Sequence, residues 1–259
     1  MKLAVLLALC FAATDACAWG LQTHIALAQQ AILPGLDASL VLAGACLPDL
    51  ALAGRALGTP AFFRSHRWST LRRITAAPRD ESERALAYGY ATHLLADVVA
   101  HNAFVPEHEA RIARIPHLTH ALAEWAMDEH VARFVPASPA RLIRAHQGLL
   151  TGFVARRFGC GEPLAERATS WLASADHWLR RSRLPRLCLR LIGSRGFDAY
   201  IERAGRALDA MQAALHGRLV DWVDLDPEGR PSAAGADGED VFVGRDRQGT
   251  RPSRSTSSR

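Results

Sequence analysis

The stretch DESERALAYGYATHLLADVVAHNAF, residues 80–104, decides the fold. Its apolar residues recur at the three- and four-residue spacing of an α-helix, and Asp80 with Glu83 resembles the capping box that opens one. Pro106 follows shortly afterwards and is expected to close the helix, because proline interrupts the backbone hydrogen bonds. The stretch therefore predicts one helix that begins at about Asp80 and ends at about Phe104.

The rest of the chain repeats this periodicity, whereas alternating runs rich in Val, Ile and Thr are almost absent, so an all-α fold is expected. Ser138 before Pro139 predicts a helix start, and Gly159 predicts the end of that helix about six turns later. Further helices are expected at 22–33, 38–46, 117–134, 163–182 and 197–223. With 259 residues and 49% hydrophobic content, the chain can bury the core of one domain.

Both ends of the chain differ from this helical body. Lys2, the apolar run 3–13 and Ala16-Cys17-Ala18 have the form of a signal peptide, residues 1–18, whose removal would expose Trp19. The apolar run is too short for a membrane anchor, so export to the periplasm or the exterior is expected. Residues 226–259 are rich in Gly, Pro, Ser, Arg and Asp and predict a disordered tail, which leaves residues 19–225 as the helical domain.

The net charge of +5 suits an anionic partner such as lipid headgroups or nucleic acid. Every basic residue after Lys2 is arginine, and residues 247–259 carry four arginines and no acid. Peripheral contact with anionic surfaces is one interpretation, and a solvated terminus without a role is the other. No protein partner can be named from the sequence.

Three cysteines remain after signal removal, Cys46, Cys160 and Cys188. A disulfide between Cys160 and Cys188 and a set of buried free thiols are both compatible with export. The chain has no C-x-x-C pair, which argues against a zinc site built from thiolates.

Three potential metal ligands lie on the helix predicted at 80–104. His93, Asp97 and His101 are four residues apart, and each step turns a helix only about 40° past a full turn, so their side chains share one face. Their apolar neighbours indicate a partly buried place, where imidazole and carboxylate groups need partners. A metal ion would supply such a partner.

A second helix carries His120 and Glu124 at the same spacing, which alone could be a helix ion pair. If the two helices pack face to face, five ligands converge, as in the metal sites of helix bundles. Asp49, directly after Pro48, and His66 lie upstream in segments not predicted to be helix interior. Seen alone, each could be an ordinary loop residue.

The predicted mature protein begins at Trp19, and His24 follows five residues later. With the stripes above, this order resembles the zinc-dependent phospholipase C superfamily, which includes the Bacillus-type phospholipases C, the fungal single-strand-preferring nucleases and the N-terminal domain of glycosylphosphatidylinositol-specific phospholipase D. The resemblance implies a compact multi-helix bundle with a tri-zinc cleft. It also implies a ligand set for up to three Zn²⁺ ions: Trp19, through its amine and carbonyl, and His24 for the first; Asp49, His66, His93 and Asp97 for the second, with Asp97 bridging; and His101, His120 and Glu124 for the third.

The spacing is a mixture of two branches of this superfamily. The five-residue step from Trp19 to His24 is similar to the nucleases, whereas the four-residue step from Asp97 to His101 is similar to the phospholipase D-related branch. The substrate therefore stays open between lipid and nucleic acid. His108 lies nearby and is an alternative to His101 as a ligand.

Such a cluster suits phosphodiester hydrolysis. Zinc with an open coordination position lowers the pKa of bound water to about 7, and paired zinc ions clamp the attacking and leaving oxygens. Asp49 is the candidate catalytic residue that orients or deprotonates the water, and its competing role is that of a ligand alone.

The expected function is that of a secreted zinc-dependent phosphodiesterase that hydrolyses phospholipid or related phosphodiesters, as a phospholipase C does. The alternatives are a single-strand-preferring nuclease and a non-catalytic, zinc-stabilised binding module. Four aromatic residues near the ligands either form a substrate-binding rim or belong to the core. They are Phe62, Phe63, Trp68 and Tyr88.

Overall fold

The structure, a computed structural model, describes residues 20–76, 78–112, 116–215 and 226–227. The predicted signal peptide, Trp19 and nearly all of the predicted tail lie outside the described residues. The described residues form helices and connecting turns without strands, which confirms the all-α prediction. The α-helices are α2 (Leu21–Gln30), α3 (Ala38–Gly44), α4 (Leu50–Ala56), α5 (Trp68–Thr75), α6 (Glu81–Val99), α7 (Val105–Ile112), α8 (Pro116–Val131), α9 (Pro139–Ala145), α10 (Gln147–Phe158), α11 (Glu162–Arg181), α12 (Leu184–Ile192) and α13 (Phe197–Leu215).

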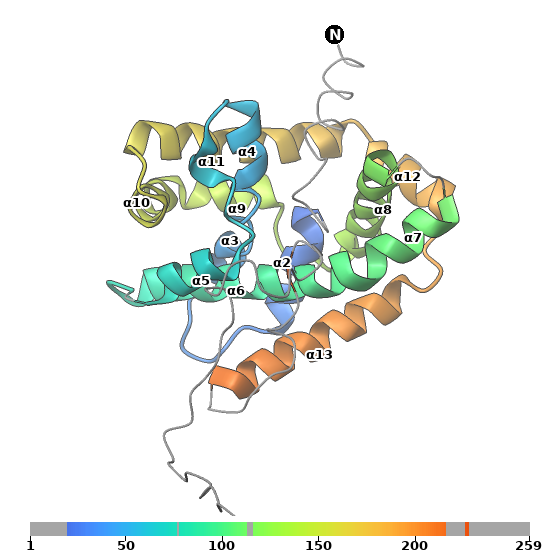
Figure 1. The fold of residues 1–259 in the computed structure, drawn as a ribbon, viewed down its shortest axis with the longest axis horizontal. Helices are drawn as coiled ribbons and strands as arrows, with labels where there is room; N and C mark the ends of the chain where they lie inside the picture. Colours follow the sequence, from blue (N-terminus) through green and yellow to red (C-terminus); the bar gives the residue numbers. More distant parts are fainter. Residues whose placement is uncertain (1–19, 77, 113–115, 216–225, 228–259) are drawn as a thin grey trace, which may run out of the picture.

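Helix α6 lies at the centre of the molecule, and every residue from Ala85 to Val99 is buried. It packs against α2, α3, α5 and α13. Figure 1 shows α13 along one side of α6 and α3 on the other, with α2 crossing α6. A helix that is surrounded on several sides carries apolar residues all around its circumference, so the few polar side chains within it require specific partners.

Helices α3 and α6 approach each other closely enough to bring their backbones into contact. A Cβ atom at Gly89 would collide with the carbonyl of Val41, and one at Gly44 would collide with the carbonyl of Leu86. Only glycine leaves the space that this crossing needs. The end of α3 is thereby held against the part of α6 that carries the predicted ligands.

The N-terminus of α6 is anchored as the capping pattern predicts. The Asp80 carboxylate accepts a hydrogen bond from the Glu83 backbone N–H at 2.8 Å. The buried Glu83 carboxylate forms ion pairs with Arg156 and Arg157 of α10, each at 2.6 Å. Burial alone would raise the pKa of Glu83, but the hydrogen bonds from Arg156, Arg79 and Arg157 outweigh burial and lower it. Glu83 therefore ties α6 to α10 as a carboxylate.

The prediction that Pro106 closes the helix is wrong. The chain continues from α6 through a π-helical turn, η2 (Ala100–Phe104), directly into α7. In this turn the Val105 N–H bonds the carbonyl of Ala100, five residues back. The wider turn changes the backbone pairing just before Pro106, which lacks an N–H and would clash with a carbonyl in a regular helix. The π turn also contains His101.

The other predicted helices are present, with ends shifted by a few residues; for the helix predicted at 197–223, residues 216–223 lie outside the described residues. Ser138 caps a helix and Gly159 ends one with a φ of 65°, as predicted, but the segment between them is two helices, α9 and α10. The break is at His146, whose φ of −113° is not helical, and His146 Nε2 lies 2.6 Å from Ser39 Oγ. The sequence analysis did not predict the short helices α4, α5 and α12.

Two further observations concern the described residues. Cys46, Cys160 and Cys188 are free thiols, so the structure contains no Cys160–Cys188 disulfide. No helix in the described part of the chain is both long enough and apolar enough to cross a lipid bilayer.

Candidate metal centre

Five of the predicted ligands meet in the interior, although four separate segments supply them. His24 lies on α2, Asp49 directly precedes α4, His66 lies in the turn before α5, and His93 and Asp97 lie on α6. All five are at most 1% exposed. Five polar groups at such depth need a common partner, because each is costly to bury alone.

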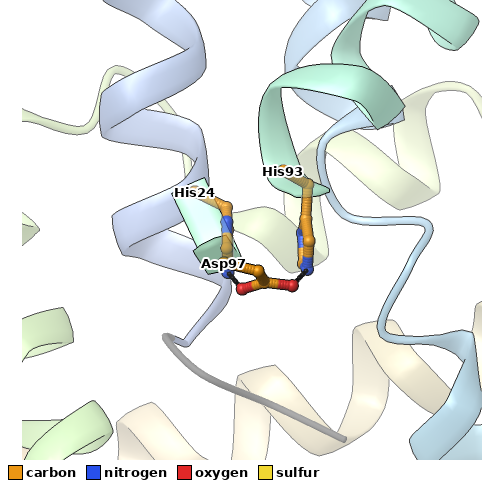
Figure 2. A group of neighbouring side chains, drawn as sticks. All are labelled: His24, His93 and Asp97. Atoms are coloured by element: carbon orange, nitrogen blue, oxygen red, sulfur yellow. Dashed lines mark ion pairs between the residues drawn. The ribbon is translucent and has the colours of Figure 1, made fainter. Parts of the chain in front are cut away.

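The Asp97 carboxylate lies between two histidines from different helices. Its Oδ1 atom is 3.3 Å from His24 Nε2, and its Oδ2 atom is 3.1 Å from His93 Nε2. Figure 2 shows the two rings side by side, with one ring nitrogen pointing at each carboxylate oxygen. Asp97 thus presents one oxygen to each histidine, which is the arrangement of a bridging carboxylate.

A second group shares His93 with the first. His66 Nε2 lies 3.2 Å from His93 Nε2, 3.5 Å from Asp49 Oδ1 and 3.5 Å from Asp97 Oδ2. The donor atoms of Asp49, His66 and His93 all lie within 4.8 Å of one another, as do those of His24, His93 and Asp97. The two groups therefore form one continuous cluster.

The close packing of α3 on α6 fixes the orientation of His93. Its Nδ1 atom lies 2.7 Å from the carbonyl oxygen of Ala45, which can only accept a hydrogen bond. Nδ1 therefore carries the proton, and a neutral ring then presents an unprotonated Nε2 atom to Asp97 and His66. A backbone carbonyl behind a metal-binding imidazole orients the ring in this way. Next to His66, the Ser65 hydroxyl donates to the Pro48 carbonyl at 2.5 Å and lies 3.4 Å from His66 Nδ1.

The residues present fit zinc in three respects. Two ligands of a tetrahedral zinc lie roughly 3.3 Å apart when each bond is about 2.0–2.1 Å, close to the separations of the paired atoms above. The rings of His24 and His93 are stacked with centroids 3.4 Å apart and direct two imidazole nitrogens at one carboxylate. Imidazole and carboxylate are also ligand types that zinc takes in sites without cysteine.

Both carboxyl groups of the cluster are ionised in this surrounding. Burial alone would raise the pKa of Asp97, but the charges of His93 and His24 outweigh it and hold the pKa well below its usual value. Burial also acts to raise the pKa of Asp49, and the hydrogen bond from His66 together with the charge of His93 lowers it. Carboxylates, rather than carboxylic acids, are what a divalent cation binds.

The third predicted set, His101, His120 and Glu124, is less compact. His120 Nε2 lies 2.7 Å from Glu124 Oε1, and the rings of His101 and His120 are 5.3 Å apart between centroids. Burial lowers the pKa of His101 to about 3 and raises that of Glu124 to about 7. Among the described residues the Nε2 atom of His101 has no hydrogen-bond partner. The set adjoins the main cluster, since the charges of Asp97 and His66 act on His101.

His108 has a different environment from these ligands. Its Nδ1 atom lies 2.8 Å from the carbonyl oxygen of Phe104, and its ring contacts Phe104 together with Phe197 and Tyr200 of α13. The described contacts of His108 are thus those of an aromatic core between α7 and α13. They give no support to the alternative in which it replaces His101.

The sequence analysis missed Asp128, which continues the stripe of His120 and Glu124 by four more residues. Its buried carboxylate accepts hydrogen bonds from the Thr23 backbone N–H at 2.9 Å and the Thr23 hydroxyl at 2.8 Å. It also lies so close to Gly20 that a Cβ there would collide with it. Asp128 thus binds the first turn of α2, and extending the four-residue repeat of α8 would have found it.

The aromatic residues divide between core and surface. Phe62 is fully buried and packs against Phe158, and Tyr88 is buried with its hydroxyl donating to the carbonyl of Ala31 at 2.6 Å. Phe63 is 48% exposed. A substrate-binding rim made of all four residues is therefore wrong, because at least Phe62 and Tyr88 belong to the core.

Comparison with known proteins gives one match. A family model described as "Zinc dependent phospholipase C" matches residues 23–156, which is more than half of the chain. The matched range contains every predicted ligand except Trp19. No curated protein and no solved structure matches the chain.

Proposed function

We propose a function on the basis of the family match, which shows that this chain belongs to the zinc-dependent phospholipase C family. As a member it is a zinc-dependent, phospholipase C-like hydrolase. The finer proposal is that it is exported and cleaves phospholipids or related phosphodiesters with metal-activated water. The observation that carries this proposal is the Asp97 carboxylate, buried between His24 and His93 with one oxygen toward each ring nitrogen.

The proposed ligand set assigns a task to each residue of the cluster. His24, His66 and His93 would bind zinc through Nε2, and Asp97 would bridge two ions. Bound zinc supplies charge for the phosphoryl oxygens and lowers the pKa of the attacking water. The hydrogen bond from His93 to Ala45 would keep the lone pair of His93 directed at the cluster.

Asp49 is the proposed catalytic residue. Its lowered pKa keeps it ionised at neutral pH, and its Oδ1 atom lies 3.5 Å from His66 Nε2 and 3.9 Å from His93 Nε2. An ionised carboxylate at the edge of the cluster can accept a hydrogen bond from the attacking water and orient it, or take its proton. The same oxygen could instead serve only as a ligand, and the experiment below separates the two roles.

The less compact residues would complete the centre. We assign the third zinc to His101, His120 and Glu124, whose rings and carboxylate adjoin the main cluster. The α-amine and carbonyl of Trp19, exposed by removal of residues 1–18, would join His24. The position of Gly20, the first described residue, beside Asp128 of α8 supports this assignment, because α8 also carries His120 and Glu124.

The experiment compares zinc content and turnover of wild-type protein, Asp49→Asn and the control Asp209→Asn, which removes an exposed carboxylate on α13. We expect wild type and the control to release headgroup from phosphatidylcholine vesicles, and Asp49→Asn to lose about 10²–10⁴-fold in kcat/KM. If Asp49→Asn keeps its full zinc content but loses turnover, Asp49 acts on the attacking water. If the variant loses zinc, Asp49 serves as a zinc ligand. Unchanged turnover overturns its role. Cleavage of single-stranded DNA instead of lipid would identify a nuclease, and cleavage of neither a binding module.

A further inference from the structure

Large apolar side chains gather on the surface near the end of α11 and on α12. Trp178 is 65% exposed, Leu187 is 50% exposed and Leu191 is 71% exposed. Most residues of this size are buried in a folded domain, and three exposed ones within fourteen positions of the chain form a feature that calls for an explanation. We call Trp178, Arg183, Leu187, Arg190 and Leu191 the α12 surface.

The two sides of α12 have opposite character. Pro185 and Cys188 are buried, and the helix packs against α8. Leu187 and Leu191 are four residues apart and so lie on one stripe of the exposed side, and Arg190, three residues after Leu187, lies beside this stripe. Arg183 is exposed directly before the helix, at a left-handed backbone position. α12 thus buries one side in the core and leaves a second apolar stripe, Leu187 and Leu191, exposed.

The same segment is strongly basic. Residues 177–196 contain six arginines and no Asp or Glu. Arg180 is paired with Asp176 at 2.8 Å and Arg186 with Glu129 at 2.9 Å. Arg181, Arg183 and Arg190 are exposed and have no ion pair among the described residues. Their charges are available to a partner.

From this combination we propose that the α12 surface binds the protein to anionic phospholipid membranes. Leucine side chains enter the boundary between headgroups and acyl chains, tryptophan lies at the headgroup level, and arginines bind lipid phosphates. Charge complementarity favours this partner over a second copy of the chain, since a symmetric dimer would bring the arginines of two copies together.

The proposal rests on the proposed function, because it places a lipid hydrolase at the surface where its substrate lies. Helix α8, against which α12 packs, carries His120 and Glu124 at the metal centre. A protein bound to the membrane through α12 would therefore have α8, the helix with two proposed zinc ligands, directly behind the bound surface. Binding itself needs no turnover, so the two proposals can be tested separately.

The test is co-sedimentation of the full mature chain with vesicles of phosphatidylglycerol and phosphatidylcholine, and with pure phosphatidylcholine. We expect wild type to bind the anionic vesicles and to dissociate as salt increases. The double variant Arg183→Gln/Arg190→Gln should bind roughly 30-fold more weakly, since each arginine near such a surface contributes about fivefold. The control Arg144→Gln/Arg167→Gln removes the same charge from exposed positions elsewhere and should change binding less than threefold.

A second pair of variants tests the apolar stripe. Leu187→Gln/Leu191→Gln should bind anionic vesicles at least tenfold more weakly, whereas Leu149→Gln, at a partly exposed position on α10, should not. The proposal is overturned if the double arginine and double leucine variants bind anionic vesicles as tightly as their controls. It is also overturned if wild type is a dimer in solution and Leu187→Gln/Leu191→Gln dissociates that dimer. Turnover of a monomeric short-chain phospholipid reports on the metal centre alone: loss of vesicle binding with this turnover intact supports the α12 surface. Binding without any turnover retains the surface and refutes the proposed function.

Discussion

Asp128 connects two parts of the molecule through hydrogen bonds at the first turn of α2. Its carboxylate binds the backbone N–H and the hydroxyl of Thr23 and so acts as a helix cap supplied by α8. Burial raises the pKa of this carboxyl group, against the lowering effects of Arg180 and Thr23. Asp128 thus positions the first turn of α2, which carries His24.

We predict that Asp128→Ala lowers the free energy of unfolding by about 1–2 kcal/mol, because the first turn of α2 loses its cap. It should also lower zinc content, since the first turn of α2, which carries His24, would no longer be held against α8. Urea unfolding of metal-free protein and metal analysis of loaded protein measure the two effects. Asp128→Asn keeps one oxygen acceptor and should restore most of both.

The matched control is Asp37→Ala, which removes the cap of α3, where the Asp37 carboxylate accepts a hydrogen bond from the Leu40 N–H at 3.0 Å. It should lose a similar amount of stability without losing zinc. If both variants lose zinc equally, the metal content reports only general destabilisation, and Asp128 is no more than a cap.

Helix α6 holds two proposed ligands, His93 and Asp97, in register because contacts constrain it along its length. At its start, Glu83 binds Arg156 and Arg157; along its middle, Gly89 allows α3 to reach His93; at its end, the π turn displaces His101 from a regular helical position. The helix is thus a rigid support whose position depends on contacts with α3 and α10.

The ion pairs of Glu83 predict a pH dependence of stability. Because its folded-state pKa is lowered, the contribution is fully present above the unfolded pKa of about 4.3 and is lost as pH falls through the folded value. We predict that Glu83→Gln lowers the free energy of unfolding of metal-free protein by about 1.5–3 kcal/mol at pH 7. The difference from wild type should shrink as the pH is lowered from 5 toward 3.

Glu81→Gln is the control on the same turn, because Glu81 forms an exposed pair with Arg84. It should change stability by less than about 1 kcal/mol at any pH. A Glu83 effect that does not vary between pH 7 and 3 would mean that packing, and not charge, accounts for it.

At the scale of the whole molecule, the proposed metal binding is coupled to folding. The five compact candidate ligands come from segments spread over residues 24–97, so only the folded chain would bring them together around zinc, and bound zinc would therefore stabilise the fold. The proposed ligand Trp19 adds a further requirement, since its amine becomes available only after cleavage before it.

We predict that a mature protein with one extra glycine before Trp19 binds about one zinc fewer per chain than the correctly processed protein, because an amide nitrogen replaces the amine. The rise in melting temperature on zinc addition should be correspondingly smaller. Metal analysis and thermal unfolding measure both, with a glycine added at the C-terminus as control. Equal zinc content in all three proteins would exclude the Trp19 amine as a ligand.

The sequence by itself determined the features that depend on residues a few positions apart, namely helix faces and helix caps. His93 and Asp97 share a face because helix geometry repeats nearly every four residues, and Asp80, Ser138 and Gly159 act as the caps that their residue types predict. The resemblance to the family rests on the order of such short-range patterns along the chain, and the family match confirms it.

The tertiary structure alone decided which of these groups meet. The approach of His66 to His93, the capping of α2 by Asp128, the aromatic environment of His108 and the π turn before Pro106 all depend on how distant segments pack. Local propensity does not contain that information, because burial and backbone contact, as between Gly89 and Val41, arise only when the helices are assembled.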